Sequence, residues 1–285
     1  MVLFPVTIYY FPLLKNRGLP HESEKKKEVM LTAYDYQTAR YAVEAGVDIL
    51  LVGDSLGTNV LGYSSVHDVT LSDMLHHTRA VKRGAGTAIV VSDLPYTSMK
   101  TPEKCRDHAQ SLLENGADMV KIEVETGRAP YLDLLNREKI PFCGHIGFTP
   151  QTPGLSVSLQ GKTARRATEL LSLAKHIEHA GAKYLILELI PYNIAAHITS
   201  SVQTPTIGIG AGPYCNGEVQ VWYDICGISE KTYRHTQVFA PVGREIRTAF
   251  TEYVHAVQHD RFPTIKNAGV APEETLLTLT GEIHP

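Results

Sequence analysis

The chain has 285 residues, of which 43% are hydrophobic and 20% charged, and 27 Lys and Arg against 30 Asp and Glu leave a net charge of −3. This composition is ordinary for a globular protein. The absence of a basic stripe beyond residues 25–27 argues against nucleic-acid binding. The four cysteines lack the Cys-x-x-Cys spacing of zinc or redox sites, so we expect reduced thiols and a cytoplasmic location.

Residues 1–14 are apolar and aromatic but lack the basic start and the small-residue cleavage site of a signal peptide. Pro5 and Pro12 interrupt the segment, which is also too short to span a bilayer. We therefore expect a packed N-terminal arm over residues 1–28 and no membrane partner.

From Val29 onward, short apolar runs alternate with amphipathic stretches. The runs predict strands at residues 29–33, 49–52, 88–91, 118–123, 141–145, 184–188, 205–210 and 238–240. Helices are expected at residues 37–45, 71–83, 102–115, 131–137, 164–180 and 242–259. The alternation is typical of α/β proteins with parallel strands. It predicts a single (β/α)₈ TIM-barrel domain over residues 29–263, followed by a tail at 264–285.

Polar side chains stand at the carboxyl ends of five of the predicted strands. They are Asp54 and Ser55, Asp93, Lys121 and Glu123, His145, and Glu188. Each has a structural explanation by itself, such as a helix cap, a core histidine or a structural ion pair. However, TIM-barrel active sites are built at this rim. The recurrence of such residues at one rim therefore favours a catalytic site.

Three of these residues, Asp54, Asp93 and Glu123, are carboxylates of the kind that bind Mg²⁺ or Mn²⁺. Zinc is disfavoured, since the rim has one histidine and no clustered cysteines. A 2-oxo acid could chelate the metal, which would act as a Lewis acid and stabilise the enolate formed by proton removal. Glu188 is the candidate base, because it lies outside the carboxylate set.

Several segments resemble the ketopantoate hydroxymethyltransferase (3-methyl-2-oxobutanoate hydroxymethyltransferase) family, within the phosphoenolpyruvate mutase and isocitrate lyase superfamily. They are Leu31–Tyr36, Leu51–Gly57, His77–Val81, Val120–Glu123, Gly144–Gln151 and Gly208–Gly212. The resemblance covers about residues 29–263. It implies hydroxymethyl transfer from 5,10-methylenetetrahydrofolate to 2-oxoisovalerate, giving 2-dehydropantoate on the route to pantothenate.

Carried over by position, the resemblance implies a magnesium set of Asp54, Asp93 and Glu123, with Mn²⁺ or Co²⁺ as substitutes. It implies substrate contacts from Asp54, Ser55, Asp93 and Lys121. Glu188 resembles the proton acceptor, and His145 matches a motif position near the substrate. The family also implies a homo-oligomer, often a decamer.

The chain departs from the family pattern at several positions. Val124 and Glu125 replace a glycine pair, and the lid at residues 152–159 is shorter and lacks a Gly-Gly-Tyr-Lys run. Other departures are Leu189-Ile190 for Cys-Val, Asn216-Gly217-Glu218 for Asp-Gly-Gln, and Thr58. A divergent paralogue that performs hydroxymethyl transfer or C–C lyase chemistry on another 2-oxo acid is the first alternative. A non-catalytic assembly protein is the second, and the intact rim carboxylates argue against it.

Overall fold

The computed structural model describes residues 26–231 and 233–280, so most of the predicted N-terminal arm and the last residues of the predicted tail lie outside the described residues. The chain divides into two compact units. The first runs to Trp222 and includes residues 233–237, and the second comprises Tyr223–Lys231 and the residues from Val238 onward. The first unit holds all the strands found in the described residues.

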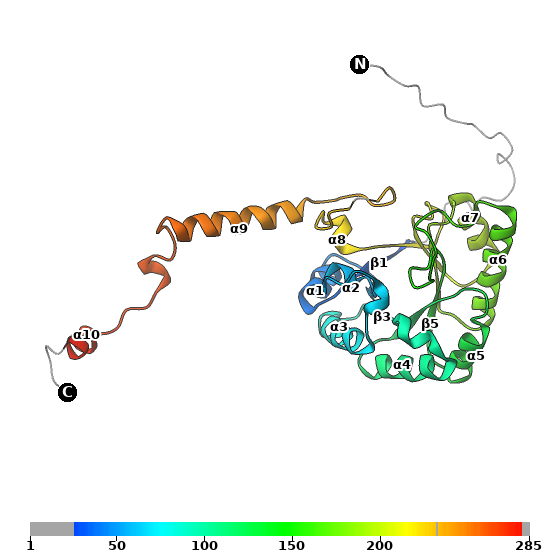
Figure 1. The fold of residues 1–285 in the computed structure, drawn as a ribbon, viewed down its shortest axis with the longest axis horizontal. Helices are drawn as coiled ribbons and strands as arrows, with labels where there is room; N and C mark the ends of the chain where they lie inside the picture. The colour runs from blue at the N-terminus through cyan, green and yellow to red at the C-terminus, as the bar shows by residue number, and fades with distance from the viewer. Residues whose placement is uncertain (1–25, 232, 281–285) are drawn as a thin grey trace, which may run out of the picture. The chain divides into compact units, whose positions relative to one another are not determined.

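Eight parallel strands close into a barrel in the first unit (Figure 1). Each strand pairs with the next along the chain, and the last pairs with the first, with Val219 opposite Met30. The strands are β1 (Glu28–Thr32), β2 (Ile49–Val52), β3 (Ile89–Asp93), β4 (Met119–Glu123), β5 (Phe142–Gly147), β6 (Tyr184–Glu188), β7 (Thr206–Ile209) and β8 (Gly217–Gln220). The predicted α/β class and TIM-barrel fold are confirmed.

Helices connect most of the strands. They are α1 (Tyr36–Glu44), α2 (Leu56–Asn59), α3 (Leu71–Gly84), α4 (Pro102–Glu114), α5 (Ala129–Arg137), α6 (Ala164–His179) and α7 (Tyr192–Ser201), with short 3₁₀ turns η2 (Val66–Asp68) and η3 (Tyr96–Lys100). Thr70 and Asp73 form a reciprocal cap at the start of α3, and Thr101 caps α4. Helix α7 was not predicted from the sequence. It follows Pro191 without a side-chain cap, so the usual start signal is missing.

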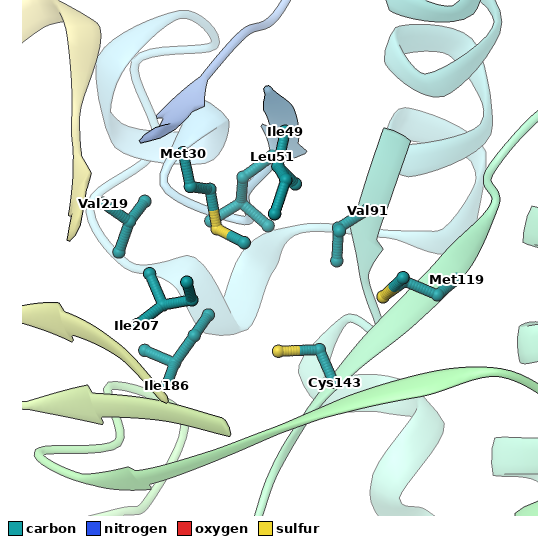
Figure 2. Close-up of a cluster of buried hydrophobic side chains, with 9 residues drawn as sticks. All are labelled: Met30, Ile49, Leu51, Val91, Met119, Cys143, Ile186, Ile207 and Val219. Carbon is teal, nitrogen blue, oxygen red and sulfur yellow. The ribbon is translucent and has the colours of Figure 1, made fainter. Parts of the chain in front are cut away.

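The barrel interior is filled by apolar side chains, to which every strand contributes (Figure 2). The cluster consists of Met30, Ile49, Leu51, Val91, Met119, Cys143, Ile186, Ile207 and Val219. Inward-facing residues alternate along each strand, so a residue two positions beyond a cluster member faces the same interior. Lys121 is two positions beyond Met119, and His145 is two positions beyond Cys143. Both side chains therefore face the barrel interior, above the apolar cluster and at the rim.

The predicted eighth strand at residues 238–240 is wrong. β8 is formed by Gly217–Gln220, which pairs with both β7 and β1. Its pattern is hard to recognise because Val219 is its only apolar side chain, flanked by Glu218 and Gln220. By contrast, Val238 and Phe239 are exposed. The eighth strand is therefore defined by its backbone pairing with β7 and β1, and not by a run of apolar residues.

The second unit is helical. Its elements are α9 (Val242–Gln258), η4 (Ile265–Asn267) and α10 (Glu273–Thr280), and the single turn α8 (Trp222–Ile225) begins at its boundary. Helix α9 confirms the helix predicted at residues 242–259, but it belongs to the second unit and not to the unit that contains the barrel strands. Across residues 26–231 and 233–280, no helix is long and apolar enough to cross a membrane.

Candidate active site

All seven predicted rim residues line one cavity of about 120 Å³ at the carboxyl ends of the strands. Asp54 and Ser55 follow β2, Asp93 and Glu188 end β3 and β6, and β4 and β5 supply Lys121, Glu123 and His145. Gly53 permits the close approach of these groups, since a Cβ at this position would lie 3.0 Å from the Ser55 hydroxyl oxygen. The structure therefore brings the predicted set together.

A buried ion pair joins neighbouring strands at the rim. Lys121 Nζ lies 2.6 Å from Asp93 Oδ1, and the backbone N–H of Asp54 donates to Asp93 Oδ2 at 2.9 Å. Burial alone would lower the pKa of Lys121, but the carboxylates of Asp93, Asp54 and Glu123 outweigh it and raise that pKa. The Lys121 ammonium therefore stays protonated at neutral pH.

Acidic side chains outnumber basic ones among the buried rim residues. Burial and the neighbouring Asp93 raise the pKa of Asp54 to about 7, and burial raises the pKa of Glu123 well above its ordinary value. Oε1 of Glu123 is buried and has no hydrogen-bond partner within residues 26–231 and 233–280. An unpartnered carboxylate oxygen beside two further carboxylates fits a site for a hard divalent cation.

The three carboxylates do not form a closed metal cage. Within the described ranges, no group of three His, Cys, Asp or Glu side chains is arranged to hold a metal ion. Both oxygens of Asp93 are already engaged, by Lys121 and by the Asp54 backbone. This arrangement suits Mg²⁺ better than a metal that needs a full set of protein ligands, because Mg²⁺ keeps waters and binds substrate oxygens.

His145 lies between two carboxylates and is 1% exposed. Its Nδ1 is 3.7 Å from Glu123 Oε1, and its Nε2 is 3.2 Å from Glu188 Oε2. Neither ring nitrogen has a well-aligned hydrogen-bond partner. Burial lowers the pKa of His145, and the nearby Glu188 only partly offsets this effect. The ring is therefore a neutral imidazole beside the predicted base.

The cavity also has an apolar floor. Leu51, Ile186 and Val219 belong both to the barrel core and to the cavity lining. Ile209, another lining residue, pairs in register with Glu188 on the adjacent strand. Glu188 thus stands between β5, which supplies His145, and β7, which supplies Ile209.

Two buried residues that contact the rim set were not proposed as site residues from the sequence. The hydroxyl of Tyr34 lies 2.9 Å from the Ser55 hydroxyl, and Asn59 Nδ2 donates to Tyr34 at 3.3 Å. Gln151 contacts both Asp54 and Glu123. Tyr34 and Gln151 both lie within segments that carry the family resemblance, which is the signal that could have identified them.

Sequence comparison decides the family. The profile of the family described as ketopantoate hydroxymethyltransferase matches residues 17–265. The chain belongs to this family. It is 45% identical over 261 residues to the 3-methyl-2-oxobutanoate hydroxymethyltransferase of Chloroflexus aurantiacus, covering 90% of each chain. A Caldivirga maquilingensis protein of the same name is 42% identical over 263 residues, covering 91% of this chain and 96% of the relative. The prediction of a hydroxymethyltransferase enzyme is thus confirmed.

Solved structures share the barrel fold of this chain. A phosphonopyruvate hydrolase in complex with oxalate and Mg²⁺ aligns with a TM-score of 0.58 at 12% identity, covering 90% of this chain and 91% of that one. A 2,3-dimethylmalate lyase of the phosphoenolpyruvate mutase/isocitrate lyase superfamily aligns with a TM-score of 0.55 at 17% identity, covering 90% of each. At these identities the likeness concerns the fold alone.

Proposed function

We propose that this hydroxymethyltransferase transfers the one-carbon unit of 5,10-methylenetetrahydrofolate to 3-methyl-2-oxobutanoate, giving 2-dehydropantoate on the route to pantothenate. The observation that carries the proposal is the position of Glu188 in a cavity that has both a charged half and an apolar floor. A short branched 2-oxo acid likewise has a polar head, formed by its carboxylate and keto groups, and an apolar branched tail. Its C3 lies where the head and the tail meet. The names of the relatives support this substrate.

The charged half suits the head of the acid. The protonated Lys121 and the Ser55 hydroxyl would bind the carboxylate and keto oxygens. Tyr34 orients the Ser55 hydroxyl through the contact at 2.9 Å. Leu51, Ile186 and Val219 would receive the branched alkyl group, since burial of apolar surface favours that orientation.

The carboxylates fit a divalent cation. Asp54, Asp93 and Glu123 would hold Mg²⁺, or Mn²⁺ or Co²⁺ in its place, together with water or substrate oxygens, because the three side chains alone do not close around a metal ion. When bound, the ion supplies Lewis-acid polarisation of the keto group. Lys121 remains paired with Asp93 and contributes positive charge to the same part of the site.

Glu188 would act as the base. Its side chain is 20% exposed, against 2% for Asp93 and 5% for Glu123. Among the residues that the structure describes, no cation pairs with it apart from the neighbouring His145 if that ring gains a proton. It would take the C3 proton while the C–H electrons form the C2=C3 bond of the enolate. C3 then forms the new C–C bond to the donor carbon, while the two C–N bonds that held this carbon in the folate break. One water supplies the hydroxyl oxygen. Its two hydrogens and the proton taken from C3 end on the hydroxyl group and the two folate nitrogens, and tetrahydrofolate leaves.

The deciding experiment is NMR of a panel of 2-oxo acids in D₂O with the protein and Mg²⁺. We expect C3 exchange that is fastest with 3-methyl-2-oxobutanoate, and hydroxymethylated product only after the folate donor is added. Preferred exchange of another oxo acid would establish the divergent-paralogue alternative, and no exchange of any would overturn the proposal. Self-association into a homo-oligomer remains a prediction of the resemblance, and sedimentation velocity measures it.

A further inference from the structure

Gln151 lies in the loop that follows β5, at the start of the segment predicted as a lid. It is 6% exposed, but it is not among the residues that line the cavity. It therefore contacts the carboxylates from outside the cavity.

The side-chain amide of Gln151 uses both of its hydrogens. Nε2 donates to Asp54 Oδ2 at 2.8 Å and to the backbone oxygen of Leu94 at 2.9 Å. Because both partners are acceptors, the amide orientation is defined. The backbone N–H of the same residue donates to Glu123 Oε2 at 2.9 Å. One residue thus makes hydrogen bonds at the carboxyl ends of three strands, β2, β3 and β4.

The loop that carries Gln151 is itself anchored. The backbone oxygen of Gln151 lies 3.2 Å from His67 Nε2, and the ring of His67 stacks on Tyr96 with centroids 4.3 Å apart. Within the loop, Thr149 Oγ1 contacts Thr152 Oγ1 at 2.8 Å. The backbone of Gln151 is therefore held by His67 while its donors face the two carboxylates.

We propose that Gln151 is a positioning residue for the divalent cation site. It holds one oxygen of Asp54 and one of Glu123, which leaves the unpartnered Oε1 of Glu123 for the cation side. A ligand carboxylate fixed by a hydrogen-bonded partner loses less freedom when the ion binds. This inference rests on the proposed function, because it takes the cation site as given.

The test measures Mg²⁺ affinity by isothermal titration without substrate. Gln151→Glu keeps the shape but replaces the donor with an acceptor facing Asp54, and Gln151→Met removes both side-chain donors. We expect the Kd for Mg²⁺ to rise by about 10–100-fold in both variants. Saturating Mg²⁺ should restore most of the C3 exchange rate of Gln151→Met, which a general loss of structure would not allow.

The matched control is Gln160→Glu, in the same loop segment. Among the described residues, its side-chain amide bonds only to Ser158. The Mg²⁺ affinity of this variant should therefore change by less than about threefold. If Gln151→Glu does not fold, Gln151→Asn keeps the amide with a shorter reach and should still weaken Mg²⁺ binding. Folded Gln151 variants with unchanged affinity would overturn this role while leaving the proposed function intact. Failure of the unmutated chain to bind Mg²⁺ would instead overturn the cation site itself.

Discussion

Lys121 and Asp93 form their ion pair at 2.6 Å with side chains only 8% and 2% exposed, on directly paired positions of β4 and β3. A buried pair of this kind costs desolvation energy and is weak evidence for stability by itself. Its place at the cavity rim gives it a chemical meaning, because it keeps one positive charge in a site that otherwise carries carboxylates. The pair also bears on the choice between two mechanisms. A lysine on a barrel strand could be a nucleophile that forms a Schiff base, or it could contribute only its charge to metal-assisted enolisation.

We expect Lys121 to act as a charge and not as a nucleophile, because the surrounding carboxylates keep its ammonium protonated. Borohydride treatment in the presence of the oxo acid should leave the mass of the protein unchanged. Lys121→Met should destabilise the fold by about 3–5 kcal/mol, because it leaves Asp93 buried without its partner. A stable substrate adduct on Lys121 would establish Schiff-base chemistry instead.

Activity should require a divalent cation. Asp54→Asn removes one charged ligand and should weaken Mg²⁺ binding by more than about 100-fold, since even outer partners cost about 10–100-fold. Asp35→Asn is the control, because Asp35 caps α1 and asparagine is an equally good cap. Titration calorimetry measures both variants. Full activity after exhaustive chelation would contradict the requirement.

Glu188→Gln should separate proton removal from binding. The variant keeps the shape of the side chain, so affinity for Mg²⁺ and the oxo acid should stay near normal. C3 exchange, followed by NMR without the folate donor, should fall by about 10²–10⁴-fold because the basic oxygen is lost. Undiminished exchange would remove Glu188 from this role and direct attention to His145, 3.2 Å away.

Ile209→Ala should widen the apolar side of the cavity next to Glu188. The kcat/KM ratio of 3-methyl-2-oxopentanoate to 3-methyl-2-oxobutanoate should rise by about 10-fold or more, since one methylene in an apolar pocket is worth about 1–3 kcal/mol. Ile207→Val is the control, because Ile207 belongs to the core but not to the cavity lining. It should cost about 0.5–1.5 kcal/mol of stability without changing the ratio. An unchanged ratio in Ile209→Ala would show that another wall sets the size limit.

Glu218, where the family pattern has glutamine, should make stability depend on pH. Burial raises its pKa from 4.5 to about 7. Between these values the folded chain keeps a proton that the unfolded chain releases, so this contribution is present below pH 4.5 and is lost as pH rises through 7. The loss is at most about 3.5 kcal/mol, at about 1.4 kcal/mol per pKa unit.

Glu218→Gln removes this titration and keeps an oxygen that can accept from Gln220, as Glu218 Oε1 now does at 2.8 Å. Urea unfolding at pH 5 and pH 8 should show the variant gaining stability relative to the unmutated protein at the higher pH. Glu114→Gln, on an exposed position of α4, is the control. If the unfolding free energies of Glu218→Gln and the unmutated protein differed by the same amount at both pH values, Glu218 would not have a raised pKa in the folded protein.

Much of the barrel could be predicted, because seven of its strands are marked by apolar runs. Each run carries enough hydrophobic surface to require burial on its own, and glycines such as Gly46 and Gly84 mark the helix ends. Strand β8 could not be found in this way. Only Val219 contributes an apolar side chain, so its identity depends on the open edges of β7 and β1, which exist only in the folded barrel.

The sequence by itself determined the fold class, the family and the rim set, because strand periodicity and strand ends are local properties. Lys121 and Glu123 share a face since they are two positions apart, whatever surrounds them. Only the tertiary structure decided the partners of these residues. The contact of Gln151 with Asp54 joins positions 97 residues apart, and that of Tyr34 with Ser55 joins positions 21 residues apart. Such contacts depend on the closure of the barrel, which brings loops that are far apart in the sequence to one rim. No local sequence pattern shows which of these loops will meet.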